Sequence, residues 1–202
     1  MKRIAGLLIL AVAFLAPALM AQEEHGEVGV YADYTRLSHA GNANFWGPAA
    51  SIGFNVNKWV QLEANMGYQP AQTVTFTGVT TSGTGTGTTV GTNSFTSNIR
   101  LLEGMFGPKF QVPAGPFKAF FELKGGFLNF NSSNKNGGAV GFANAVNNIT
   151  SGDTNGVFYP GAGVELGMRH GIGIRAEVGD LMYFDNGANH NLKFMIGPTL
   201  RW

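Results

Sequence analysis

The feature of this sequence that most restricts its fold is an alternation of apolar residues with small or polar ones, which recurs along most of the chain. In FYPGAGVELGMR, at 158–169, apolar side chains and a proline take the even positions, while Tyr159, Glu165, Arg169 and three glycines take the odd ones. A period of two is that of a β-strand, whose successive side chains point to opposite faces. No stretch after residue 21 shows the i, i+3, i+4 spacing of an amphipathic helix over three turns. The sequence therefore predicts an all-β fold.

The alternating segments and their connections predict the topology. Eight segments alternate, at 27–37, 45–55, 59–69, 94–111, 117–130, 157–169, 172–184 and 191–202. Short turns at 56–58, 112–116 and 170–171 alternate with connections at 38–44, 70–93, 131–156 and 185–190, two of which are long. This order is typical of an up-and-down antiparallel barrel with turns at one rim and loops at the other. Alternating threonines in the uncharged segment 70–93 predict that strands three and four continue as a protruding hairpin.

The first 21 residues have the anatomy of a secretory signal peptide. Lys2 and Arg3 precede an uncharged apolar core at 4–15, then Pro17 and a small-residue segment that ends at Ala21. The core is shorter than the ~20 residues that a membrane-spanning helix needs, which argues against an N-terminal anchor. We therefore expect cleavage after residue 21 and a barrel domain at 22–202. Because the chain has no cysteine, disulfides and a lipidated cysteine are excluded.

Composition decides which face of the strands points outward. Charged residues make up 12% of the chain, about half the ~25% of ordinary soluble domains. Removal of 1–21 takes two of the 13 basic residues and leaves 11 against 12 acidic ones, a net charge of −1 without the basic patch that nucleic-acid binding needs. The polar face is rich in small residues, as at Gly47, Ala49, Ser51 and Gly53. Small residues suit the narrow lumen of an eight-stranded barrel, so we expect the apolar face to contact lipid. A lipocalin-like barrel would place its apolar face inside.

Aromatic residues gather at the two ends of the predicted strands. Two such girdles are typical of the two interfaces of a membrane. One rim collects Phe54, Trp59, Phe110, Phe117 and Trp202, and the opposite rim collects Tyr34, Trp46, Tyr68, Phe95, Phe158 and Tyr183.

The last predicted strand, NLKFMIGPTLRW at 191–202, ends on an aromatic residue, and FGPKF at 106–110 precedes a short turn. With these features the chain resembles, over essentially all of 22–202, the small outer-membrane β-barrel superfamily of Gram-negative bacteria, the OmpA/OmpX/OmpW-like proteins. In that family the barrel-assembly machinery reads the terminal strand. Gly197, Leu200 and Trp202 match this assembly signal, whereas Met195 stands where the family usually has a large polar residue.

The resemblance implies an eight-stranded antiparallel up-and-down transmembrane β-barrel with short periplasmic turns and longer extracellular loops. It also implies a monomer in the cell outer membrane. Its expected partners are outer-membrane lipid, lipopolysaccharide and, during biogenesis, the barrel-assembly machinery.

Charged residues on the polar face predict a charge network in the lumen. Its expected members are Glu63, Arg100, Glu103, Glu122, Lys124, Glu165, Arg169, Arg175, Glu177 and Lys193. Buried charges are costly unless they are paired, so balanced signs favour a salt-bridged plug, with an ion path lined by exchanging pairs as the alternative. Arg100 and Glu103 differ by three positions and cannot share a face of a regular strand, which predicts a β-bulge at 101–102.

The sequence favours a non-enzymatic barrel with a structural or surface-interaction role through the extracellular loops 70–93 and 131–156. The alternatives are a narrow pore for small or apolar solutes and a lipid-modifying enzyme. An enzyme would draw on residues at the loop rim, namely Asp33, Ser38, His39, Asp185 and His190. Spacing does not bring a nucleophile and a base within hydrogen-bond reach, so no catalytic site is predicted. Four scattered histidines without H-x₃-H spacing predict no zinc site, and no cofactor is expected.

Overall fold

The computed structural model describes residues 25–38, 43–84, 87–136, 154–167, 171–185 and 187–202, with side chains described outside 74–95 and 132–136. Ten strands form one sheet. They are β1 (Gly26–Leu37), β2 (Ala43–Asn57), β3 (Val60–Thr84), β4 (Gly87–Ala114), β5 (Phe117–Asn136), β6 (Thr154–Gly167), β7 (Ile172–Asp180), β8 (Met182–Phe184), β9 (Ala188–Asn189) and β10 (Leu192–Arg201). In these residues no helix is long and apolar enough to cross a membrane.

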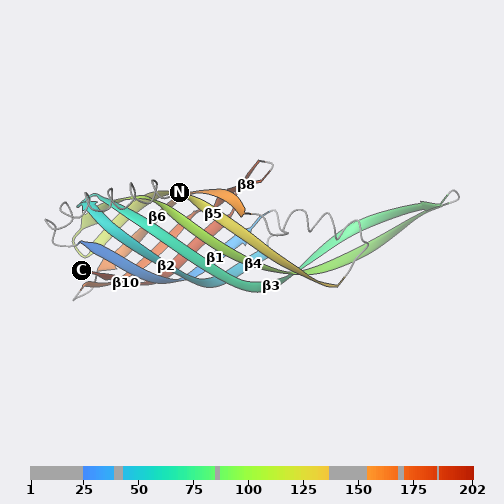
Figure 1. Cartoon of the computed structure of the whole chain (residues 1–202), viewed down its shortest axis with the longest axis horizontal. Coiled ribbons are helices and arrows are strands. Elements are labelled where there is room, and N and C mark those ends of the chain that lie inside the picture. Colours follow the sequence, from blue (N-terminus) through green and yellow to red (C-terminus); the bar gives the residue numbers. More distant parts are fainter. Residues whose placement is uncertain (1–24, 39–42, 85–86, 137–153, 168–170, 186) are drawn as a thin grey trace, which may run out of the picture.

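The sheet closes on itself into a barrel (Figure 1). Every pairing is antiparallel, and the closing seam joins β1 to β10 from Glu27↔Arg201 to Arg36↔Leu192. β7 and β8 continue one register against β6, so together they act as one barrel strand. β9 forms a short hairpin with β8 and leads into β10. The predicted closed, antiparallel, eight-stranded barrel is therefore confirmed.

Short turns lie at one end of the barrel, here named the turn end. In the β2–β3 turn, the side-chain oxygen of Asn57 accepts hydrogen bonds from the backbone amides of Trp59 and Val60, at 2.8 and 2.9 Å. The β4–β5 turn passes through Gly115, whose φ of 64° favours a residue without Cβ. Both turns fall in or beside the predicted ranges 56–58 and 112–116. The third predicted turn, 170–171, lies mostly outside the described residues.

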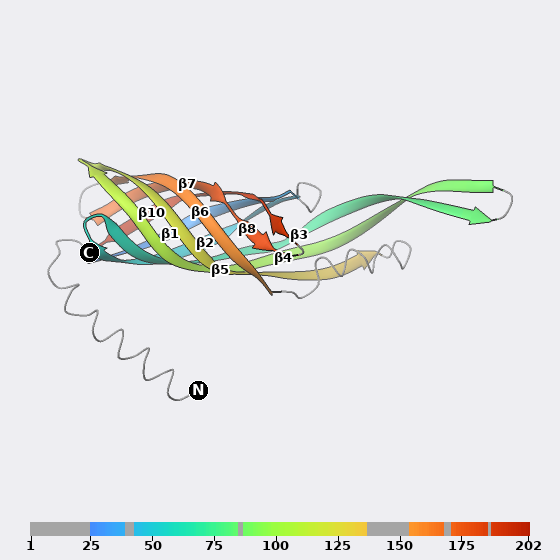
Figure 2. The same cartoon turned by 90° about the horizontal axis from the view of Figure 1, so that it is seen from above.

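At the opposite end, named the loop end, β3 and β4 continue well past the barrel wall. Their ladder runs without a break from Gln72↔Ile99 to Thr84↔Gly87, so the predicted hairpin is confirmed. Figures 1 and 2 show this ribbon extending far beyond the other strands. Most of 70–93 is therefore strand rather than loop, and β5 also runs on to Asn136.

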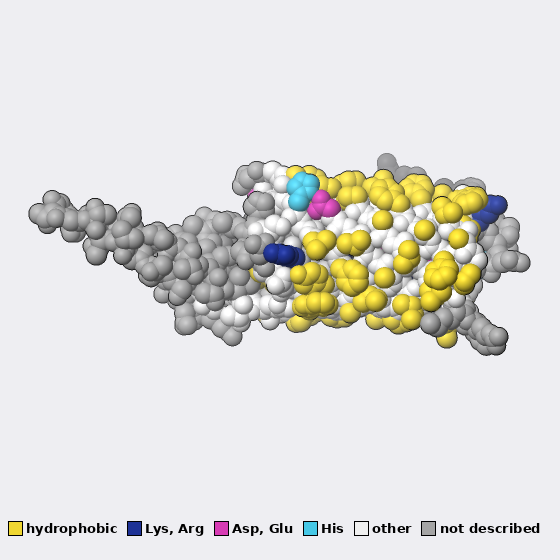
Figure 3. Space-filling view, turned by 180° about the vertical axis from the view of Figure 1, so that it is seen from behind, with side chains coloured by type: hydrophobic (Ala, Val, Ile, Leu, Met, Phe, Trp, Pro, Cys, Tyr) yellow, Lys and Arg dark blue, Asp and Glu magenta, His cyan; other side chains and the backbone are white. Residues whose placement is uncertain are grey.

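The apolar face of the strands lies on the outside of the barrel. Val30, Met66, Phe106 and Val164 are 55–60% exposed, and each belongs to the apolar phase of its strand. Figure 3 shows such side chains covering the barrel wall as a broad band, with charged side chains only near its margins. The inward phase carries the buried charged and amide side chains.

Candidate functional site

The lumen is the candidate site, and its section toward the turn end is organised around Arg175. The guanidinium of Arg175 donates to Glu63 at 2.6 Å, to Glu122 at 2.8 Å and to Glu177 at 2.5 Å. Lys124 joins two of the same carboxylates, Glu63 at 2.8 Å and Glu122 at 2.6 Å. All five side chains are buried, and they come from β3, β5 and β7, so the contacts tie separate strands together across the lumen.

A second group of charges continues this cluster to the turn end. Lys109 donates to Glu27 at 3.2 Å and to Glu165 at 2.9 Å. Arg201 donates to the other oxygens of the same two carboxylates, at 2.9 Å to Glu27 and through a shorter contact to Glu165. The whole inner cluster thus holds five carboxylates against four cations. Its members are Glu27, Glu63, Glu122, Glu165 and Glu177 with Lys109, Lys124, Arg175 and Arg201.

A middle cluster lies nearer the loop end. Lys193 donates to Asp33 and to Glu103, both at 2.5 Å. Gln69 donates to the second Asp33 oxygen at 2.7 Å and to the Thr35 hydroxyl at 3.1 Å. All five residues are buried.

Beyond the middle cluster the lumen is mostly apolar, although Ser97 and Asn191 are also buried there. Inward side chains from six of the ten strands, together with Leu181 between β7 and β8, pack together there, and most are almost fully buried. This apolar plug consists of Leu37, Phe45, Ile99, Leu101, Met105, Leu128, Phe130, Val157, Tyr159, Leu181 and Tyr183. The sequence analysis placed polar side chains throughout the lumen, which is wrong for this section. The described lumen is therefore filled by charges toward the turn end and by hydrocarbon toward the loop end.

The ten residues expected in the lumen network are distributed unevenly. Eight are buried inside the barrel: Glu63, Glu103, Glu122, Lys124, Glu165, Arg175, Glu177 and Lys193. Arg169 lies outside the described residues. Arg100 is exposed on the outer face. The predicted bulge at 101–102 is absent, because the extra residue lies on β3 between Gln69 and Gln72, and β4 keeps its alternation.

Sequence reasoning missed three charged members of the lumen, Glu27, Lys109 and Arg201, and assigned Asp33 to the loop rim. A signal for them was present. Lys109 is six positions from Glu103 and therefore faces the same side of β4. Glu27 and Asp33 are also six positions apart and face the same side of β1. Asp33 is fully buried against Lys193 and belongs to the middle cluster.

Most residues predicted for the aromatic girdles are exposed on the outer face. Trp46, Phe54, Trp59, Tyr68, Phe110, Phe117, Phe158 and Trp202 are 39–55% exposed. Tyr34 is half-buried, with its ring centroid 4.7 Å from that of Trp46. Tyr183 does not belong to a girdle. It is 7% exposed, and its ring packs edge-on against Phe130 inside the plug, with the two ring centroids 5.2 Å apart. The side chain of Phe95 lies outside the described part.

The residues matched to the assembly signal lie along the seam. Gly197 is packed so closely that a Cβ there would be 2.0 Å from the carbonyl oxygen of Val30 on β1. Leu200 and Trp202 are 48% and 50% exposed on the outer face. The backbone of Trp202 exchanges hydrogen bonds with that of Gly26, both at 3.1 Å. The end of the chain is therefore held by the first strand.

The rim residues considered for catalysis do not converge. His190 Nδ1 lies 2.6 Å from Asp180 Oδ2 in a pair that is largely exposed. Ser38 contacts this region through its backbone amide, which donates to Asn191. Asp33 is inside the barrel, Asp185 is half-buried after β8, and His39 lies outside the described residues. Over the described ranges, no three His, Asp or Glu side chains are placed to hold a metal ion.

Solved structures with this architecture belong to bacterial surface and outer-membrane proteins. Neisserial surface protein A has a TM-score of 0.57 at 10% identity, with 90% of this chain and 98% of that chain covered. The attachment invasion locus protein Ail of Yersinia pestis has a TM-score of 0.51 at 10% identity, with 89% and 97% covered. Outer membrane protein OprG of Pseudomonas aeruginosa has a TM-score of 0.51 at 8% identity, with 89% and 96% covered.

This chain has the fold of the small eight-stranded outer-membrane β-barrels. Identities of this size show the fold alone. No protein-family model and no curated protein sequence matches the chain. The function of this outer-membrane-type barrel therefore has to be argued from its own residues.

Proposed function

We propose that this chain is a non-enzymatic outer-membrane β-barrel protein with a filled lumen, and that it acts in a structural or surface-interaction role through the extracellular segments 70–93 and 131–156. The observation that carries the proposal is the double filling of the lumen. A paired charge cluster occupies it toward the turn end, and the apolar plug occupies it toward the loop end. An ion would have to separate buried pairs and then cross hydrocarbon, both of which are costly.

The exposed apolar band supports placement in a membrane. Its outward side chains, among them Val30, Met66 and Phe106, would be unfavourable in water over so large an area. A closed barrel leaves no strand edge unpaired within the wall, which is what hydrocarbon requires of a spanning structure. Residues 1–21 would direct export as a cleaved signal peptide. The barrel-assembly machinery would then insert the mature chain as a monomer among outer-membrane lipid and lipopolysaccharide.

Single-channel recording in planar lipid bilayers tests the filled lumen. We expect the purified barrel, shown to be folded by heat-modifiable migration on gels, to give no reproducible conductance steps. A general porin recorded under the same conditions is the positive control. Reproducible steps from the wild-type barrel would refute the filled lumen and favour the narrow pore for small or apolar solutes.

Lipid mass spectrometry tests the non-enzymatic part of the proposal. Outer-membrane lipids from cells with and without the gene should have the same acyl and phosphate composition. His190→Ala, which removes the exposed His190–Asp180 pair, is the variant that tests for a catalytic role at the rim. A lipid modification that depends on the gene and disappears in His190→Ala would show that the barrel is an enzyme.

A further inference from the structure

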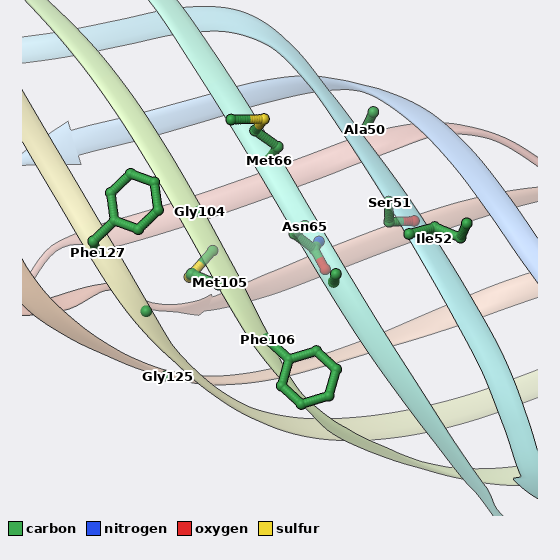
Figure 4. Close-up of a pocket in the computed structure, with 12 residues that line it drawn as sticks. Ala50, Ser51, Ile52, Asn65, Met66, Gly104, Met105, Phe106, Gly125 and Phe127 are labelled. Carbon is green, nitrogen blue, oxygen red and sulfur yellow. The ribbon is translucent and has the colours of Figure 1, made fainter. Parts of the chain in front are cut away.

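The outer wall of the barrel contains a groove within the apolar band. It is an open, shallow groove that crosses β2, β3, β4 and β5, has a volume of about 590 Å³ and is lined almost entirely by apolar atoms. Figure 4 shows Ile52, Met66, Phe106 and Phe127 around it, each from a different strand. All four side chains are 38–58% exposed on the outside of the barrel, so the groove opens away from the lumen.

The groove arises from the pairing of large with small residues on neighbouring strands. Ala50 pairs with Met66, and Met66 in turn pairs with Gly104. In the next row of the sheet Ile52 pairs with Ala64, and Ala64 with Phe106. Ala50, Ala64 and Gly125 lower the wall between the large side chains, whereas the ring of Phe127 lies over Gly104. The shape and the apolar lining fit a hydrocarbon chain that lies against the wall.

A single positive charge stands on the same face of β4 as the groove. Arg100 is four residues from Gly104 toward the loop end, about 13 Å along an extended strand, and only Leu102 lies between them on that face. Arg100 is exposed, and in the part of the chain that the structure describes it makes no ion pair. Its neighbour on β5 is the neutral Asn131. On the β3 side, the register shift places the neutral residues 70–71 beside it.

A cation at the margin of an apolar band, with no ion pair to the described residues, is complementary to an anion at the level of the lipid headgroups. We propose that this groove and Arg100 form a binding site for a phosphate-bearing lipid of the outer leaflet, with one acyl chain in the groove and the phosphate at Arg100. The guanidinium presents N–H donors in a planar fork that matches phosphate oxygens. The site rests on the proposed membrane placement, because it needs the loop end of the wall to face the outer leaflet.

Lipid titration followed by native mass spectrometry tests the site. The mature barrel in neutral detergent micelles is titrated with dioleoylphosphatidic acid and, separately, with dioleoylglycerol, which has the same chains and no phosphate. We expect one tightly bound phosphatidic acid and weaker binding of the diacylglycerol. Inorganic phosphate should not compete, because the acyl chain supplies much of the binding.

Two sets of variants separate the contributions of charge and groove. Arg100→Gln should weaken phosphatidic acid binding about 10-fold, the lower range for a hydrogen bond to a charged group at an exposed site, and leave the diacylglycerol unchanged. Arg36→Gln is its control, because Arg36 is an exposed outward arginine on β1, away from the groove. Ala64→Leu should weaken both lipids by filling the groove, and Ala50→Leu is the second filling variant. Ala162→Leu, on the outer face of β6, is the control for both.

The outcomes decide the proposal. Equal binding of the two lipids, equal loss in Arg36→Gln and Arg100→Gln, or unchanged binding in both filling variants would overturn it. Dimers that Ala64→Leu dissociates would also overturn it, since the groove would then hold a second copy of the chain. Gel migration reports folding of each variant, and conductance of the same preparations reports the lumen, so a failed lipid site and a failed filled lumen give different results.

Discussion

Replacement of Arg175 by methionine should be the most damaging single change in the lumen. Arg175 is fully buried and donates to three carboxylates, at 2.5, 2.6 and 2.8 Å. Its loss leaves the five carboxylates of the inner cluster facing three cations. Removal of one partner from a buried ion pair costs about 3–5 kcal/mol, because the remaining charge is left without compensation. With three carboxylates affected, we expect a loss in the upper part of that range.

Urea unfolding of the barrel in lipid vesicles measures this loss. Trp46, Trp59 and Trp202 are about half exposed on the outer wall, so their fluorescence reports transfer from lipid to water. Arg36→Met, an exposed arginine outside the lumen, is the control and should change the unfolding free energy by less than about 0.5 kcal/mol.

A double-mutant cycle sharpens the test. In the Arg175→Met background, Glu63→Gln should restore part of the lost stability, because it removes one of the charges that Arg175 had compensated. A loss below about 1 kcal/mol in Arg175→Met, far under the cost of a broken buried pair, would show that water reaches the cluster. The lumen would then not be filled as described.

Three further predictions concern the seam, the terminal residue and the topology. Gly197→Ala should lower the unfolding free energy by about 1–3 kcal/mol through overpacking at the seam, whereas Gly156→Ala, where a Cβ meets nothing within 4 Å, should be close to neutral in the same urea titration. Trp202→Ala should lower the amount of heat-modifiable barrel in outer-membrane fractions while Trp202→Phe is nearly silent; wild-type yield of the alanine variant would contradict the assembly signal. Protease added to intact cells should cut within 70–93 or 131–156 and spare the turn end, and cleavage in the short turns would indicate the opposite orientation.

Strand positions and the closed barrel were predictable because they depend on local alternation and on the lengths of the connections. Arg100 shows where this reasoning fails. Its face depends on which of two paired strands contains the extra residue, and the bulge lies in β3, 30 residues away in sequence. Spacing within β4 shows only that Arg100 and Glu103, three positions apart, cannot both face inward in a regular strand. It does not show which of the two faces outward.

The two halves of the lumen were not distinguishable in sequence for a similar reason. Leu101 and Leu128 lie on the inward faces of strands that also carry the buried charges Glu103 and Lys124, so neither leucine marks an apolar section by itself. They contact one another only after strand tilt and register bring separate strands to the same level. Tyr183 was misplaced for the same reason, since it stands at the end of a strand but in the inward phase.

The seam between β1 and β10 has a consequence for the order of folding. Lys193 reaches Asp33 across 160 positions of sequence, and Arg201 reaches Glu27 across 174. Contacts that span nearly the whole chain carry the largest loop-closure entropy, and folds that depend on them form slowly. Hairpins such as β3–β4 need no such closure and can pair early. Until the seam forms, β1 and β10 both present open edges, and Lys193 and Arg201 lack their partners Asp33 and Glu27, so closure pairs the backbone and these charges in one step.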